Sequence, residues 1–266
     1  MSDDTHEGGD SHARAVVDDD EHGWSAVATE WAGLWGGFAE PVRRVLIAEA
    51  KIGPGSRVLD VGCGSGEFLA TLAGAGAVAA GIDPARGMVG EARRRAPQAE
   101  VRLGGVDDLP WADVSFDVVT AVNALQFAYD TLEALGEMIR VAGPGGRIAV
   151  ANWADRAHND IDTVEIAVAA ADGEEPQPDG DLRLEGGLEE LFRDAGLEVL
   201  SAGLVELPWE AEDDDALVRG VLLGAPPEER RASAPVVLAA ARPFVRPGGG
   251  YRLLNAFRYV VGRVPD

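Results

Sequence analysis

Short apolar runs alternate with amphipathic stretches through the middle of the chain. The runs are typical of strands buried on both faces of a sheet, and they fall at 57–62, 77–83, 100–105, 116–123 and 147–153. Helices are expected between them at 67–75, 85–96 and 131–141. Because strands and helices alternate, the pattern predicts an α/β fold with a parallel sheet covered by helices on both faces.

An aromatic pattern precedes this core. Trp24, Trp31, Trp35 and Phe38 recur at spacings of seven, four and three, which predicts one face of a helix. A second helix is expected at 42–50, after a proline that suits a first helical position. Residues 23–50 would then form two N-terminal helices next to the core.

Helices and two further strands are expected after the core. Residues 174–187 hold prolines and glycines and predict a loop. The elements expected after it are a helix at 188–195, a strand at 198–209, helices near 213–223 and 228–241, and a strand at 251–264. Because no internal repeat is present, residues 23–266 are expected to form one domain with a helical insertion at 211–245.

The charge of the chain limits its partners. Its 266 residues include 46 acidic and 23 basic side chains, a formal charge of −23. This charge argues against nucleic acid, which is bound through cations, and against an anionic membrane surface. The expected partner is a small molecule, bound by a monomer or a homodimer. Residues 1–22 are acidic with few apolar side chains and predict a disordered tail.

The cysteine content and the N-terminal sequence indicate in which cellular compartment the protein is expected. Cys63 is the single cysteine, which excludes an intrachain disulfide and a metal site built from several cysteines. We therefore expect no metal. The N-terminus is acidic where a signal peptide needs basic and then apolar residues, and the most apolar stretch, 72–82, is short and rich in glycine. A cytoplasmic protein without a membrane span is expected.

The sequence VLDVGCGSG at 58–66 carries the most informative motif. A buried strand runs into Gly62, Gly64 and Gly66, and a helix opens at Glu67. Glycines allow a tight turn and a close approach of ligand to backbone, and the free N–H groups at the helix start attract an anionic group. Nicotinamide and flavin enzymes share such a loop.

Residues next to the glycines indicate which kind of ligand the loop binds. A dinucleotide site needs a small residue five positions after the first glycine, and here that position holds Glu67, too large to lie against a pyrophosphate. Asp60 precedes the glycines and suits a positively charged amino group. Asp83 ends the second strand and suits the two hydroxyls of a ribose. The loop therefore predicts a ligand made of a nucleoside with an amino-acid tail.

Three further segments extend the motif: GIDPARGMV at 81–89, LPWADVSFDVV at 109–119 and RVAGPGGRIAVANW at 140–153. Together with the glycine loop, they resemble the class I S-adenosylmethionine-dependent methyltransferases, of the type that acts on small molecules. The resemblance covers about 57–153, the expected cofactor-binding core. It implies a doubly wound, Rossmann-like sheet of seven strands, six parallel and one antiparallel, with helices on both faces. The implied cofactor is S-adenosylmethionine and the product S-adenosylhomocysteine.

The resemblance implies a set of cofactor contacts. They are Asp60, Gly62, Cys63, Gly64, Gly66, Asp83, Pro84, Met88, Val106, Asp107 and Asn123. Asp60 and Gly62 would hold the methionine moiety, and Asp83 the ribose. Met88 would pack on the adenine, and Asn123 would face the reacting methyl group.

The chain departs from the family pattern at Gly105, where the family often has an aspartate that binds the adenine amino group. The adenine contact would then fall to the backbone at Val106 and to Asp107. Cys63 is expected to be a small loop residue and not a nucleophile, because methyl transfer needs none.

Structural roles compete with these assignments. Asp60 would also serve as a cap of the glycine turn, and Asp83 as a helix N-cap with Pro84 at the first helical position. Met88 would be expected in any helix core.

Residues expected around the acceptor lie on the aromatic helix or follow the fourth and fifth strands. They are Trp24, Trp31, Gln126, Phe127 and Trp153. The tryptophans of segment 23–50 would form either core packing or a lid over the cofactor. His158 is the candidate general base, and a structural or exposed histidine is the alternative.

The expected reaction is in-line transfer of the methyl group to an oxygen, nitrogen or carbon atom of a small, hydrophobic metabolite. The segment NALQ at 123–126 lacks the proline pair that marks methyltransferases acting on the amino groups of nucleobases or glutamine. The helical insertion would cover the acceptor pocket at the carboxyl ends of the strands. A protein that binds S-adenosylmethionine without methylating, as a cyclase or a regulatory partner, remains the alternative. Glu67 disfavours a nicotinamide-dependent oxidoreductase.

Overall fold

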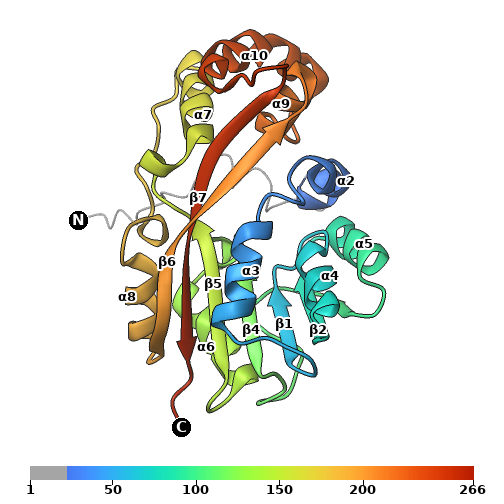
Figure 1. Ribbon diagram of the computed structural model, residues 1–266, viewed down its shortest axis with the longest axis vertical. Helices are drawn as coiled ribbons and strands as arrows, with labels where there is room; N and C mark the ends of the chain where they lie inside the picture. The colour runs from blue at the N-terminus through green and yellow to red at the C-terminus, as the bar shows by residue number, and fades with distance from the viewer. Residues whose placement is uncertain (1–22) are drawn as a thin grey trace, which may run out of the picture.

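A central sheet organises the fold. The computed structural model describes residues 23–266, so the acidic segment 1–22 and its expected disorder lie outside the described residues. Within residues 23–266 the sheet has seven strands in the order β3-β2-β1-β4-β5-β7-β6 (Figure 1). The strands are β1 (Arg57–Val61), β2 (Val78–Asp83), β3 (Glu100–Leu103), β4 (Val118–Val122), β5 (Arg147–Trp153), β6 (Glu198–Ala211) and β7 (Tyr251–Arg263).

The strand directions follow from the pairing. Strands β1 to β5 pair in parallel, and β7 runs antiparallel to both of its neighbours, β5 and β6. β6 therefore points the same way as β1 to β5. The predicted Rossmann-like sheet of six parallel strands and one antiparallel strand is confirmed.

Helices cover both faces of the sheet, as predicted. One face carries α3 (Glu40–Glu49), α4 (Glu67–Gly74) and α5 (Arg86–Arg95), and the other carries α6 (Thr131–Ala142) and α8 (Gly187–Asp194). In α6, the Asp130 carboxylate accepts hydrogen bonds from the backbone N–H groups of Leu132 and Glu133, which caps the helix. Leu135 and Met138 then bury one side of α6 in the core. Short 3-10 turns lie in the connections: η1 (Leu125–Phe127), η2 (Arg156–His158), η3 (Asp181–Arg183) and η4 (Arg242–Phe244).

The last two strands extend beyond the rest of the sheet. Trp153, the last residue of β5, pairs with Phe257 of β7. Residues 206–211 of β6 and 251–256 of β7 continue past this point as a two-stranded ribbon (Figure 1). The ribbon lies beyond the carboxyl end of β5, on the side of the sheet where ligands of such folds bind.

Three helices gather at the far end of this ribbon, and we call them the cap. They are α7 (Asp160–Ala171), α9 (Asp214–Val221) and α10 (Pro227–Ala240) (Figure 1). Helices α9 and α10 form the expected insertion between β6 and β7. Helix α7 was not predicted, although Ile161, Val164 and Val168 are buried at helical spacing.

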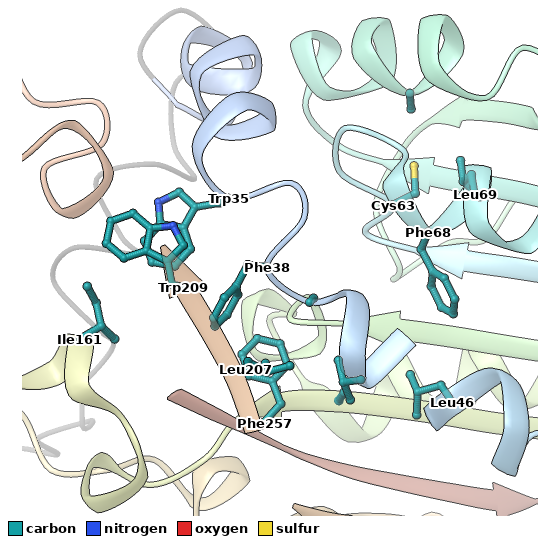
Figure 2. Packing of buried hydrophobic residues seen from close by; sticks show 14 of the residues in the cluster. Trp35, Phe38, Leu46, Cys63, Phe68, Leu69, Ile161, Leu207, Trp209 and Phe257 are labelled. Carbon is teal, nitrogen blue, oxygen red and sulfur yellow. The ribbon is translucent and has the colours of Figure 1, made fainter. Parts of the chain in front are cut away.

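The N-terminal helix is shorter than its aromatic pattern predicts. Helix α2 (Trp24–Leu34) ends before Gly36 and Gly37, and Trp35 and Phe38 lie in the turn that leads to α3. The prediction of one helical face through Phe38 is therefore wrong. The glycine pair disfavours a continuous helix, and the turn lets both rings pack with side chains of the ribbon (Figure 2).

Candidate cofactor and acceptor site

The glycine loop joins β1 to α4 through backbone conformations that favour glycine. The angle φ is +66° at Gly62, +52° at Gly64 and +86° at Gly66. A Cβ built on Gly66 would lie 2.6 Å from the Cα of Ala92, whereas one on Gly64 would meet nothing within 4 Å. Gly66 therefore allows α5 to pack against the loop, and Gly64 leaves space for a ligand to approach the backbone.

Alanine substitutions should separate these two roles. Gly66→Ala is expected to lower the free energy of unfolding by about 3 kcal/mol, because a backbone collision adds to left-handed strain. Gly64→Ala should cost only the strain, about 1–2 kcal/mol, yet weaken the binding of S-adenosylhomocysteine. Urea unfolding and calorimetry measure the two effects. Equal losses of stability in the two variants would contradict the assignment.

Asp83 fastens the glycine loop to the end of β2. Its Oδ2 accepts a hydrogen bond from the Gly64 N–H and its Oδ1 one from the Ala85 N–H, both at 2.9 Å. Burial raises the pKa of Asp83, and these two hydrogen bonds oppose the shift. Lone pairs remain on both oxygens for ligand hydroxyls. Helix α5 begins at Arg86 after Ala85 as its N-cap, so the alternative of Asp83 as N-cap with Pro84 as first helical residue is wrong.

Asp60 is a second buried carboxylate, located on β1. Its side chain faces β4, where the Thr120 hydroxyl donates to Oδ1 at 2.7 Å, so its bonding partner is a strand residue and not the glycine turn. Burial raises the pKa of Asp60 to about 7, against the hydrogen bond from Thr120 and the positive charge of Arg43. Arg43 itself donates to the carbonyl of Gly36 at 2.9 Å. A ligand cation next to Asp60 would favour its charged form.

The other expected cofactor residues occupy different environments. Cys63 is buried, and burial raises the pKa of its thiol well above the ordinary value, which fits a packing role. Met88 is 3% exposed and packs with Ala28 beneath α2. Val106 is half-buried and Asp107 exposed in the connection between β3 and β4. Their contact with adenine stays a prediction.

The turn after β4 packs directly on the glycine loop. Asn123 has a φ of +54°, uncommon for a residue other than glycine, and its N–H donates to the Ala151 carbonyl at 2.7 Å. Its Oδ1 accepts a hydrogen bond from Gln126 Nε2 at 2.7 Å. A Cβ built on Gly62 would collide with the Cβ of Ala124. Asn123 and Gln126 are therefore held next to the loop.

Helix α2 covers this turn with aromatic rings. The ring of Trp24 lies 5.1 Å from that of Trp31 and 6.1 Å from that of Phe127, both edge to face. Trp24 and Trp31 also pack against the small cluster formed by Ala28, Ala85 and Met88. The structure thus brings Trp24, Trp31 and Phe127 together at the carboxyl end of the sheet, and their contact with an acceptor stays a prediction.

Trp35 joins this region to the cap; it was expected in core packing or in a lid, but not among the acceptor residues. Its ring stacks on that of Trp209 at 4.2 Å (Figure 2) and lies 6.4 Å from that of Trp153. Its indole N–H donates to the Gly220 carbonyl at 3.1 Å, and that of Trp209 donates to the Leu34 carbonyl at 2.8 Å. The sequence predicted a strand that ends at Trp209 but carried no signal of the ring that packs on it.

Polar contacts fix α2 on two sides. Glu30 accepts two hydrogen bonds from Arg230 of α10, at 2.9 and 2.7 Å. The Thr29 hydroxyl donates to Glu91 of α5 at 2.7 Å. Helix α2 thus bridges the cap and the cofactor-binding core, the position that a lid would take.

His158 lies in η2, after β5. Its Nδ1 is 2.9 Å from Asp155 Oδ1, and Arg258 of β7 donates to the other carboxylate oxygen at 2.8 Å. The His158 side chain is 43% exposed. These contacts orient the imidazole but lie toward β7, on the opposite side of β5 from Asn123. The structure therefore does not bring His158 together with the glycine loop.

The residues of the site fit S-adenosylmethionine. The buried carboxylates of Asp60 and Asp83 match a cationic amino group and ribose hydroxyls, and the open side of Gly64 admits a ligand. Glu67 occupies the position that a pyrophosphate would need and is paired with Arg95. The donor set suits a nucleoside with a charged amino-acid tail better than a dinucleotide.

Comparison with known proteins supports the resemblance. Residues 59–150 match the family model described as a methyltransferase domain. The match falls within the segment 57–153 that carries the resemblance, and the similarity to methyltransferases found in the sequence is confirmed. A demethylmenaquinone methyltransferase of Beutenbergia cavernae is 40% identical over 111 residues, which are 42% of this chain and 46% of that protein. The match thus spans less than half of that relative's length.

Solved structures share the fold. The [4+2]-cyclase SpnF has a TM-score of 0.57 at 19% identity, covering 87% of this chain and 83% of that one. A SAM-dependent methyltransferase from Aquifex aeolicus has a TM-score of 0.51 at 20% identity, covering 69% of this chain and 92% of that one. At these identities the likeness concerns the fold alone. Among residues 23–266, no helix has the length and apolar character needed to cross a membrane.

Proposed function

We propose that the protein transfers the methyl group of S-adenosylmethionine to an oxygen, nitrogen or carbon atom of a small, hydrophobic metabolite. The observation that carries the proposal is the hydrogen bond between the glycine loop and β2, which the Gly64 N–H donates to the buried Asp83 carboxylate. The methyltransferase-domain match at 59–150 supports the reaction class. The aromatic rings above β4 and a relative named demethylmenaquinone methyltransferase support an apolar, quinone-like acceptor.

Catalysis in this site would depend on alignment and the exclusion of water. The cofactor, when bound, supplies a methyl group on a positive sulfur atom, which is already electrophilic. Asp60 and Asp83 would hold the two polar ends of the cofactor, and Trp24 would shield the turn at Asn123 from water. An acceptor that must lose a proton would need a base closer to the cofactor than His158, whose Nδ1 contacts Asp155 on the β7 side of β5.

Calorimetry with S-adenosylhomocysteine tests the cofactor assignment, with NADH titrated in parallel. We expect the homocysteine ligand to bind and NADH not to bind. Asp83→Ala should weaken binding about 100-fold, because it removes the ribose partner and loosens Gly64. Asp83→Asn keeps the side-chain shape and should also weaken binding, which guards against a loss of folding.

Asp172→Ala is the matched control, since Asp172 is exposed at the end of α7 and should leave binding unchanged. Failure of S-adenosylhomocysteine to bind, or a preference for NADH, would contradict the proposal. Once binding is established, conversion of S-adenosylmethionine to S-adenosylhomocysteine in the presence of acceptors distinguishes methyl transfer from binding without transfer.

A further inference from the structure

The turn after β4 holds an amide oxygen that receives no hydrogen bond from residues 23–266. Gln126 Nε2 donates to Asn123 Oδ1 at 2.7 Å, which fixes the orientation of the Gln126 amide. The Oε1 of Gln126 is buried and receives no hydrogen bond from the described residues. Buried polar atoms are nearly always paired, because an unpaired one loses the hydrogen bonds that water would give it. The orphaned oxygen therefore points to a ligand.

A second such oxygen lies on the neighbouring strand. Asn152 is 4% exposed near the end of β5, and its Oδ1 also has no donor within residues 23–266. The residue before it, Ala151, accepts the Asn123 N–H at 2.7 Å. Asn123 and Asn152 thus take adjacent places at the carboxyl edge of the sheet.

Gln126 is located between the glycine loop and helix α2. On one side of it in the turn, Ala124 packs so closely on Gly62 that this glycine has no room for a Cβ. On the other side, Phe127 contacts Trp24 of α2 at 6.1 Å between ring centroids. A molecule that reaches the methyl group from beneath α2 would pass this residue.

We propose that the acceptor is a planar, apolar ring bearing a hydroxyl or N–H group, and that Gln126 accepts the hydrogen bond from that group. This inference rests on the proposed function. An uncharged amide oxygen matches a neutral hydrogen-bond donor. Because the orientation of the Gln126 amide is fixed, its oxygen would set the position of the hydroxyl or N–H group of the acceptor. The rings of Trp24 and Phe127 supply flat apolar surface for the remainder of the molecule.

Equilibrium dialysis with a matched probe pair tests the proposal. The protein is loaded with S-adenosylhomocysteine and dialysed against 1-naphthol or against naphthalene, which lacks only the hydroxyl. The natural protein should bind 1-naphthol about tenfold more tightly than naphthalene. Gln126→Met keeps the side-chain length without the acceptor oxygen and, with S-adenosylhomocysteine at a saturating concentration, should reduce the preference to about twofold. Gln98→Met, at an exposed position, is the control and should keep the full preference.

The outcomes separate this inference from the proposed function. Binding of S-adenosylhomocysteine with no preference for 1-naphthol, or with neither probe bound, overturns the inference and leaves the cofactor assignment standing. A preference that survives in Gln126→Met also overturns it. Absence of S-adenosylhomocysteine binding in the natural protein overturns the proposed function and the inference together.

Discussion

Asp60→Asn should make the protein more stable without cofactor and yet bind S-adenosylhomocysteine about 100-fold more weakly. Burial raises the pKa of Asp60 to about 7, so the charged carboxylate destabilises the folded protein. Asparagine keeps the shape and can still accept the 2.7 Å hydrogen bond from Thr120. The gain in unfolding free energy is on the order of 2–4 kcal/mol above pH 7. The loss of affinity follows because the ligand's amino group would lose its buried counter-charge.

The gain in stability depends on pH in a defined direction. The ordinary pKa of this carboxyl group is 3.8, and in the folded protein it is about 7. Between these values the folded protein keeps a proton that the unfolded chain has released, so the unfolding free energy contributed by Asp60 falls as pH rises. The advantage of Asp60→Asn should be absent below about pH 4, grow up to about pH 7 and stay constant above it. Urea unfolding at several pH values measures this curve.

Asp117→Asn is the matched control for this substitution. Asp117 lies at the opposite end of β4, where hydrogen bonding to Arg57 lowers the pKa of its carboxyl group. Asparagine there should reduce stability at neutral pH and leave ligand binding unchanged. The account of Asp60 would be wrong if Asp60→Asn were less stable than the natural protein above pH 7, or if it bound S-adenosylhomocysteine equally well.

The cofactor half of the site was predictable because its determinants are local. The apolar run before Gly62 forms β1, and the positive φ values at Gly62, Gly64 and Gly66 are those that glycine favours. Asp83 ends β2 as its run predicted, and parallel strands bring β1 and β2 to the same edge. Each step needs only a short window of sequence and the rule that alternating strands and helices give a parallel sheet.

The acceptor half was predicted only in part, because it depends on contacts between distant segments. Helical spacing placed Trp35 on the same helix as Trp24, but the Trp35 side chain bonds to Gly220, 185 residues away. The helical spacing of the aromatic residues gives no indication that Gly220 is the partner. At Trp35, tertiary packing outweighs the local preference for a helix. The same limit applies to His158, which the sequence places near the acceptor and the structure orients toward β7 through Asp155.

Helix α2 contacts two parts of the molecule that are far apart in the sequence, the cap and the cofactor-binding core. Residues of the cap and of the core both hold this helix, through Arg230 on one side and Glu91 on the other. As the proposed lid, α2 would depend on both contacts, so acceptor binding and the stability of the ribbon should be coupled through this helix. Trp35 offers a test, because it follows α2 directly and contacts the cap.

Trp35→Ala should therefore combine a large loss of stability with a faster release of ligand. Trp35 is 7% exposed, stacks on Trp209 at 4.2 Å and donates to the Gly220 carbonyl. Loss of the indole ring should lower the free energy of unfolding by about 4 kcal/mol, which urea denaturation measures. Trp35→Phe keeps most of the ring packing and should cost about 1–2 kcal/mol. Because the turn after α2 loses one of its contacts with the cap, stopped-flow measurements should show faster dissociation of S-adenosylhomocysteine from Trp35→Ala. Equal stability of the two variants would show that packing at Trp35 does not hold the lid.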